Sequence, residues 1–337
     1  MDKLDRFKGC LVGGGAGDAL GYTVEFWSEG RIFQKYGEKG ITPADFTKAT
    51  AIISDDTQMT LFTAAGLNYA ARTGAKDMED YRLAIGEAYL DWLITQEGMG
   101  ARPERGNWLL KEARLYSWRA PGNTCLSALQ SGSFGSVAQP INHSKGCGGV
   151  MRVAPCGLFF EDAAQAAIAG AEAAAVTHGH TLAQLPSAML AAMVSELTWR
   201  ETGVREAADA ALSVVREQFE GLDHLEDFVE LMERAMWLAG RDDISDLDAI
   251  HRLGEGWVGD EAMAIALYCA LRYPEDFSAA ITAAVNHRGD SDSTGAIAGN
   301  IVGAHVGLSG IPHENTDLLE LKDVMLRMAG ELYDNRK

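Results

Sequence analysis

Apolar residues recur at helical spacing along most of this chain, and the sequence therefore predicts an all-α fold. Steps of three and four residues between apolar positions predict helices over residues 51–72, 81–94, 163–176, 182–199, 205–219, 225–238, 261–273 and 277–285. Several of these segments are rich in alanine on most faces, which indicates helices packed among other helices. Strand signals are weak, because no long run of β-branched residues alternates with polar ones.

Two longer stretches, residues 25–50 and 101–143, lack this periodicity, and each ends at a motif that could carry chemistry. Long irregular stretches inside a compact protein are often functional. No low-complexity linker and no fixed-period repeat divides the chain, so we expect residues 1–337 to form a single domain.

The amino-acid composition argues against some classes of binding partner and some cellular locations. The formal net charge of −19 repels phosphate backbones and anionic lipid heads, which argues against a general nucleic-acid or membrane role. Five cysteines, odd in number and without C-x-x-C pairs, indicate reduced thiols rather than a disulfide framework. The charged N-terminus does not resemble a signal peptide, and no apolar run reaches the length of a membrane span. We therefore expect a cytoplasmic protein, and a monomer.

Two acidic motifs stand directly before predicted helices. The first is Ser54-Asp55-Asp56-Thr57, and the second runs from residue 289 to 294 and reads Gly-Asp-Ser-Asp-Ser-Thr. Each one alone is adequately explained as a helix cap with favourable charge in the first turn. A cap needs only one such residue, however, and here several oxygen-bearing side chains follow one another.

The two motifs together point to a metal site, provided that the fold brings them together. Close carboxylates repel one another unless a cation lies between them. Oxygen ligands of this kind suit Mg²⁺, Mn²⁺ or Ca²⁺ rather than zinc. Four aspartates and two serines would be enough to bind two metal ions that orient a substrate and activate water.

Three further motifs have a structural and a functional interpretation. Residues 13–21 are rich in glycine but follow no strand, so close helix packing is a better interpretation than a dinucleotide site, with Asp18 as a cap or a centre-lining residue. Glu25 follows among apolar neighbours and could point inward. The stretch Ser144-Lys145-Gly146-Cys147-Gly148-Gly149 could be a flexible turn or a nest of N–H groups for a phosphate. In the Thr177-His178-Gly179-His180 turn, we expect His178 at a pocket rim and His180 at the surface.

Taken together, these motifs resemble the ADP-ribosylglycohydrolase family, which includes dinitrogenase reductase-activating glycohydrolases and ADP-ribosylarginine hydrolases. The resemblance rests on residues 17–21 with Glu25-Phe26, and on residues 54–59, 146–155, 177–178 and 289–294. The motifs run in family order over nearly the whole chain, and the ordered set is far more specific than any single motif. Cys147 stands where many members have asparagine, Ser54 and Ser293 replace threonine, and Arg288 stands where glycine is frequent.

The resemblance implies an all-α fold around two Mg²⁺ ions, with Mn²⁺ as an alternative. It implies that the metal ligands are Ser54, Asp55, Asp56, Asp290, Asp292 and Ser293. It further implies catalytic roles for Glu25, Asp56 and Asp292, with either a metal-bound water or a carboxylate as the proton acceptor. The loop of Ser144, Lys145, Gly146, Cys147, Gly148 and Gly149 would bind the diphosphate and distal parts of ADP-ribose, and His178 would lie near the ligand.

The resemblance thus predicts a magnesium-dependent hydrolase that releases ADP-ribose from a protein, and modified arginine is the acceptor we favour. Serine, a nucleic-acid base or a small molecule stay open as acceptors, because the shared motifs serve the ADP-ribose part. Two other classes of function also stay open. A two-metal phosphoesterase would use the same ligands, and a non-catalytic protein could bind ADP-ribose without cleaving it.

Overall fold

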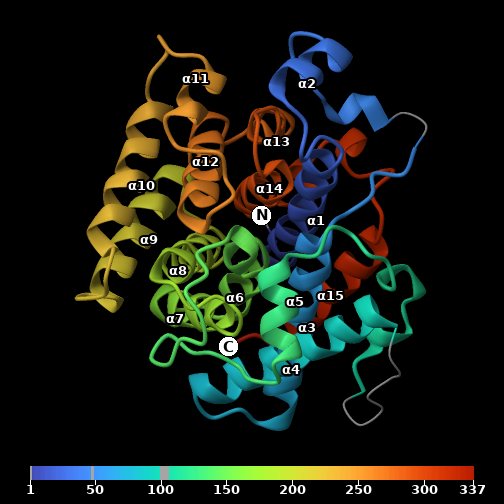
Figure 1. The fold of residues 1–337 in the computed structure, drawn as a ribbon, viewed down its shortest axis with the longest axis vertical. Coiled ribbons are helices and arrows are strands. Elements are labelled where there is room, and N and C mark those ends of the chain that lie inside the picture. The colour runs from blue at the N-terminus through green and yellow to red at the C-terminus, as the bar shows by residue number, and fades with distance from the viewer. Residues whose placement is uncertain (1, 47–48, 99–105) are drawn as a thin grey trace.

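The structure, a computed structural model, describes residues 2–46, 49–98 and 106–337, and these residues form helices throughout (Figure 1). Within this part of the chain, strand-like pairing is limited to two isolated bridges, Ala51 with Leu319 and Gly146 with Val258. The prediction of an all-α domain is therefore confirmed. None of the helices described is both long and apolar enough to cross a membrane.

Fifteen α-helices are present among the described residues. They are α1 (Lys3–Tyr22), α2 (Glu29–Tyr36), α3 (Asp55–Thr73), α4 (Met78–Glu97), α5 (Asn123–Gln130), α6 (Ala154–Phe159), α7 (Ala163–Ala175), α8 (Thr181–Ser195), α9 (Val204–Gln218), α10 (Leu225–Ala239), α11 (Asp246–His251), α12 (Gly259–Arg272), α13 (Phe277–Val285), α14 (Ser291–Gly310) and α15 (Lys322–Asn335). Short 3-10 helices include η1 (Pro43–Phe46), η3 (Trp108–Lys111), η4 (Ala113–Leu115), η5 (Cys147–Arg152) and η7 (His313–Asn315), and η6 (Glu196–Arg200) is a π-helical turn.

Helices α1 and α14 lie side by side at the centre of the molecule (Figure 1). Their contact is lined by glycines, so the two backbones approach each other closely. A Cβ atom added to Gly13 would lie 2.5 Å from the carbonyl oxygen of Gly299, and one added to Gly17 would lie 1.9 Å from that of Gly295. Residues 13–21 thus belong to a packed helix, as the sequence indicated, and not to a dinucleotide-binding loop.

The other helices surround this central pair in two groups. On one side, α3 packs against α4 and α15. On the other side, α8 contacts α7, α9 and α12, and α12 also packs against α10. Nearly all of α8 is buried, which agrees with the alanine-rich composition that predicted a helix surrounded by helices. The first turns of α3 and α14 both face the middle of this arrangement.

Several predicted boundaries are wrong. The helix predicted from residue 51 begins at Asp55, because the backbone before it is extended and Ala51 pairs with Leu319. The helix predicted over residues 182–199 ends at Ser195 and continues as the π-helical turn η6. The stretches 25–50 and 101–143 contain α2 and α5, both too short for a clear periodic pattern. Residues 47–48 and 99–105 of these stretches lie outside the described residues.

Candidate functional site

The start of α3 presents the first acidic motif. Ser54 is the N-cap, and its hydroxyl oxygen accepts a hydrogen bond from the N–H of Asp56 at 3.1 Å. A carboxylate oxygen of Asp55 accepts the N–H of Gly122 at 3.2 Å. One oxygen of Asp56 is buried and has no hydrogen-bond partner. The cap interpretation therefore accounts for Ser54 but leaves Asp56 unexplained.

Asp18, on α1, holds this helix start in place. Its carboxylate accepts the N–H of Ser54 at 3.0 Å and the N–H of Thr57 at 3.1 Å, and it also accepts the Thr57 hydroxyl. Burial raises the pKa of Asp18 to about 6, although these hydrogen bonds oppose the shift. Asp18 thus caps a helix other than its own, and this contact joins α1 to the acidic start of α3.

The second acidic motif forms the start of α14. The N–H of Ser293 donates to Asp290 at 3.2 Å and to Asp292 at 3.0 Å. The thiol of Cys147 donates to Asp290 at 2.6 Å. Burial, and then the neighbouring Asp290, raise the pKa of Cys147 well above its usual range, so this residue is a neutral donor.

The two helix starts converge in the fold, together with Glu25. Burial is the main cause that raises the pKa of Asp292 well above its usual range, followed by the charges of Asp56, Asp290 and Glu25. The pKa of Asp56 is raised for the same first reason, and then by Asp18, Asp55 and Asp290. Glu25 has a pKa of about 8, raised by burial and then by Asp290, and a hydrogen bond with Asp292 opposes the shift. These carboxyl groups therefore act on one another across the junction of α1, α3 and α14.

The donor chemistry of this cluster suits a hard divalent cation. Its polar atoms are carboxylate and hydroxyl oxygens, and one buried oxygen each of Glu25 and Asp56 has no hydrogen-bond partner. Positive charge would offset the mutual repulsion that raises the pKa values. Among the residues described, however, no three His, Cys, Asp or Glu side chains already form a metal-binding group.

The predicted phosphate loop lies against the segment that precedes α12. The N–H of Cys147 donates to the carbonyl oxygen of Trp257 at 3.2 Å, and the N–H of Gly259 donates to that of Lys145 at 2.8 Å. From Cys147 onward, the chain forms the 3-10 helix η5. The loop is therefore an ordered segment and not a flexible turn, and the Cys147 N–H is already occupied by Trp257.

His178 lies beside this loop, and a Cβ atom added to Gly148 would be 3.1 Å from its imidazole ring. Burial, and then the nearby Arg152, lower the pKa of His178 to about 3, so the ring is neutral. Its Nδ1 atom is 2.8 Å from the hydroxyl of Thr177. His180 is partly exposed, and its Nδ1 atom accepts the N–H of Leu182 at 3.0 Å, so that it caps α8.

Sequence reasoning missed Arg152, which is fully buried beneath the site. Its guanidinium donates to the Thr177 hydroxyl at 2.6 Å and lies 4.2 Å from the ring centre of Tyr89. The available signal was a single charged residue inside the apolar run that follows Gly149. Arg288, which departs from the family pattern, is exposed and pairs with Glu255 at 2.9 Å.

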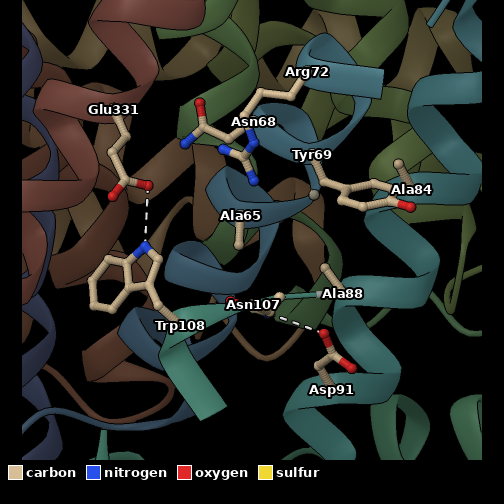
Figure 2. Close-up of a pocket in the computed structure, with 12 residues that line it drawn as sticks. Ala65, Asn68, Tyr69, Arg72, Ala84, Ala88, Asp91, Asn107, Trp108 and Glu331 are labelled. Carbon is tan, nitrogen blue, oxygen red and sulfur yellow. Dashed lines mark hydrogen bonds between the residues drawn. The ribbon is translucent and has the colours of Figure 1, made fainter. Parts of the chain in front are cut away.

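A separate small pocket lies on the later turns of α3, between α4, η3 and α15 (Figure 2). Trp108 donates to Glu331 at 3.1 Å across one side of it, and Asn107 donates to Asp91 at 3.1 Å on the other. Its cavity volume of about 30 Å³ is close to the space of one water molecule. This pocket is too small for a nucleotide and includes none of the predicted site residues.

Comparison with known proteins agrees with the architecture. The family model described as ADP-ribosylglycohydrolase matches residues 1–337. The chain is 27% identical to the ADP-ribosyl-[dinitrogen reductase] glycohydrolase of Rhodospirillum rubrum, over 97% of each chain. It is also 27% identical to an uncharacterized protein of Archaeoglobus fulgidus, over 98% of this chain and 96% of that protein. A solved structure described as an ADP-ribosylglycohydrolase-related protein complex is 26% identical, with a TM-score of 0.61 over 99% of this chain and 98% of that one.

These matches identify the protein as a hydrolase of glycosidic bonds. More specifically, the chain belongs to the ADP-ribosylglycohydrolase family, whose members hydrolyse ADP-ribose linkages. The family thus favours glycosidic cleavage over the phosphoesterase and the non-catalytic binding protein that the sequence alone left open.

Proposed function

We propose that this protein hydrolyses the N-glycosidic bond between ADP-ribose and an arginine side chain of a modified protein, and that it depends on two Mg²⁺ ions, which Mn²⁺ could replace. The observation that carries this proposal is the convergence of two acidic helix starts with Glu25. The proposed metal ligands are Ser54, Asp55, Asp56, Asp290, Asp292 and Ser293, which lie at the buried starts of α3 and α14.

When bound, the ions would supply positive charge that offsets the carboxylates and orients the hydroxyls of the ribose. The side chains contribute the remaining chemistry. In this proposal, bound cations would lower the raised pKa of Glu25, and its unpaired oxygen would take the proton of an attacking water. Asp56 is the alternative base, because one of its oxygens is also unpaired. The surrounding carboxylates favour the positive charge that develops on the sugar in an oxocarbenium-like transition state.

The arginine acceptor is supported by charge and by one relative. A guanidinium group carries positive charge and binds carboxylates well, and the site is lined with them. The relative from Rhodospirillum rubrum is named for removal of ADP-ribose from dinitrogen reductase. We propose that the loop from Ser144 to Gly149, with the neutral His178 beside it, binds the diphosphate and distal parts of ADP-ribose.

Replacement of Asp292 by alanine tests the metal assignment. In the presence of Mg²⁺, we expect Asp292→Ala to release ADP-ribose from an arginine-modified protein at least about 100-fold more slowly than the wild type, because the charge balance of the site is lost. Asp243→Ala removes a carboxylate that pairs with Arg241 and is not among the proposed ligands, and it should leave the rate unchanged. Full activity of Asp292→Ala would contradict the metal assignment.

A panel of substrates tests the acceptor and the bond that is cleaved. Peptides modified at arginine or serine, and modified nucleic acid, would be incubated with and without Mg²⁺. We expect intact ADP-ribose from the arginine-modified peptide in the presence of Mg²⁺. Faster release of ADP-ribose from the serine-modified peptide or from nucleic acid would contradict arginine as the preferred acceptor. AMP as the product would show that a phosphate bond is cleaved instead.

A further inference from the structure

Two large aromatic rings lie exposed beside the carboxylate cluster. Phe26 is 70% exposed and Trp257 is 39% exposed. Their ring centres are 5.7 Å apart and their planes differ by 21°, so the rings are stacked. The two residues, here called the aromatic pair, come from distant parts of the sequence.

The fold holds Phe26 in this position against two ordinary preferences. A large apolar side chain gains by burial, yet Phe26 faces solvent. Its φ of +62° lies in the left-handed region, which is unfavourable for a bulky residue. The turn that imposes this conformation is closed by the N–H of Glu25, which donates to Gly21 at 2.8 Å, and by the N–H of Trp27, which donates to Val24 at 2.9 Å. The same turn thus directs Glu25 inward and Phe26 outward.

Trp257 is fastened to the opposite side of the cluster. Its carbonyl oxygen accepts the N–H of Cys147, whose thiol donates to Asp290. Two residues earlier, the carbonyl oxygen of Glu255 accepts the N–H of Asp290 at 2.9 Å. One ring of the pair is therefore next to Glu25 in the chain, and the other belongs to the segment that holds Asp290.

Aromatic faces next to several carboxylates suit a cation, since both the ring faces and the carboxylates attract positive charge. In arginine-linked ADP-ribose, the guanidinium is bonded directly to the carbon at which hydrolysis occurs. It must therefore lie within about one bond length of the reacting centre, near Glu25. The adenine base lies at the far end of ADP-ribose and is neutral, so it would gain nothing from the carboxylates.

We propose that the aromatic pair binds the guanidinium of the acceptor arginine and thereby selects a cationic leaving group. This inference rests on the proposed function, because it concerns the acceptor side of the same site. The outer face of Phe26 is open to solvent and provides the contact surface, while Trp257 supports the ring from behind.

Substitutions that keep apolar bulk but remove the ring test this proposal. For Phe26→Leu and Trp257→Leu, kcat/KM with an arginine-linked ADP-ribosyl peptide should fall about 2- to 30-fold, the range expected for loss of a cation–π contact. Phe26→Tyr keeps an aromatic face and should restore most of the activity. The affinity for free ADP-ribose, measured by titration calorimetry, should stay unchanged, and the loss with a serine-linked peptide should be smaller.

Trp237→Leu is the matched control, because Trp237 is 55% exposed on α10 and contacts Arg241 rather than the site. It should behave as the wild type with both peptides.

An equal loss of affinity for ADP-ribose would overturn the proposal and assign the aromatic pair to the nucleotide. Equal losses with both peptides, or unchanged rates with the arginine-linked peptide, would also overturn it. If the serine-linked peptide is not cleaved at all, the affinity for ADP-ribose provides the comparison. A wild type that releases nothing from the arginine-linked peptide refutes the proposed function, and the acceptor contact with it. If the wild type cleaves the arginine-linked peptide and Phe26→Leu cleaves it at the same rate, only the acceptor contact is refuted.

Discussion

Replacement of Gly17 by alanine would place a methyl group at the closest approach of α1 and α14. The added Cβ atom would lie 1.9 Å from the carbonyl oxygen of Gly295, whereas real Cβ atoms essentially never come closer than 3.0 Å. The neighbour is backbone and no side chain can turn away, so the two helices must separate locally by about 1 Å. Gly17 precedes Asp18, and Gly295 is two residues after Ser293, so this separation reaches both halves of the site.

Two opposing effects decide the size of the change in stability. Alanine is the better helix former, which favours the variant by about 0.5–1 kcal/mol. Overpacking of a dense contact costs about 1–3 kcal/mol. A clash with a backbone atom, which cannot turn away, lies at the upper end of this range. We therefore expect a net loss of at least about 1 kcal/mol in the free energy of unfolding. A misplacement of about 1 Å at the reacting groups can lower the rate about 100-fold.

Urea unfolding and Mg²⁺-dependent release of ADP-ribose measure the two effects on the same protein. Gly330→Ala is the matched control, because Gly330 lies within α15 and an added Cβ would meet nothing within 4 Å. That variant should gain about 0.5–1 kcal/mol in stability and keep its activity. If Gly17→Ala were as stable and as active as Gly330→Ala, the close approach of α1 and α14 would not be what positions the site.

Two further predictions concern the buried carboxyl groups. Asp18→Ala leaves the N–H groups of Ser54 and Thr57 without their acceptor and should lower the free energy of unfolding by about 2–5 kcal/mol. Asp18→Asn keeps one acceptor oxygen and should lose less stability. Equal stability of the wild type and both variants in urea unfolding would exclude this cap. The pKa values of Glu25, about 8, and Asp18, about 6, lie above those of the unfolded chain, which are about 4, so the stability that these groups contribute is fully present only at lower pH and is lost as the pH rises from about 4 to about 6 for Asp18 and to about 8 for Glu25. In the presence of a chelator, Tm should therefore be lower at about pH 8 than at about pH 5. Mg²⁺ should raise Tm most at about pH 8. A metal-free protein with a higher Tm at about pH 8 than at about pH 5 would contradict this direction of the pH dependence.

The architecture could be predicted from the sequence where helices are long and periodic. The segments that became α4, α9, α10 and α12 have clear apolar spacing, and their predicted bounds differ from the observed ones by a few residues. Short helices such as α2 and α5 span only eight residues each, too few for a period to be recognised. The start of α3 was misplaced because the pairing of Ala51 with Leu319 is a long-range contact that no local pattern encodes.

The residues of the candidate site could be proposed from motifs, but the contacts that organise them could not. Arg152 was missed because a charged residue in an apolar run gives no sign of its partners, which come from α4 and from the turn that follows α7. The exposure of Phe26 was hidden for a similar reason, because apolar residues are ordinarily expected inside. Only the backbone conformation of the turn after α1 shows that Phe26 is held in solvent.

The glycines of α1 connect the packing of the core to the chemistry of the site. Gly9, Gly13 and Gly17 set the distance between α1 and α14, and Gly21 continues the contact, since a Cβ added there would lie 2.1 Å from the carbonyl oxygen of Ser291. Ser291 is one residue before Asp292, and Gly21 is four residues after Gly17, so the contact ends at the carboxylate cluster. Because Glu25 follows Gly21 by a single turn, its distance from Asp292 depends on this helix contact. The proposed metal-binding and catalytic groups are therefore positioned by small residues that have no side chain to contribute to the reaction.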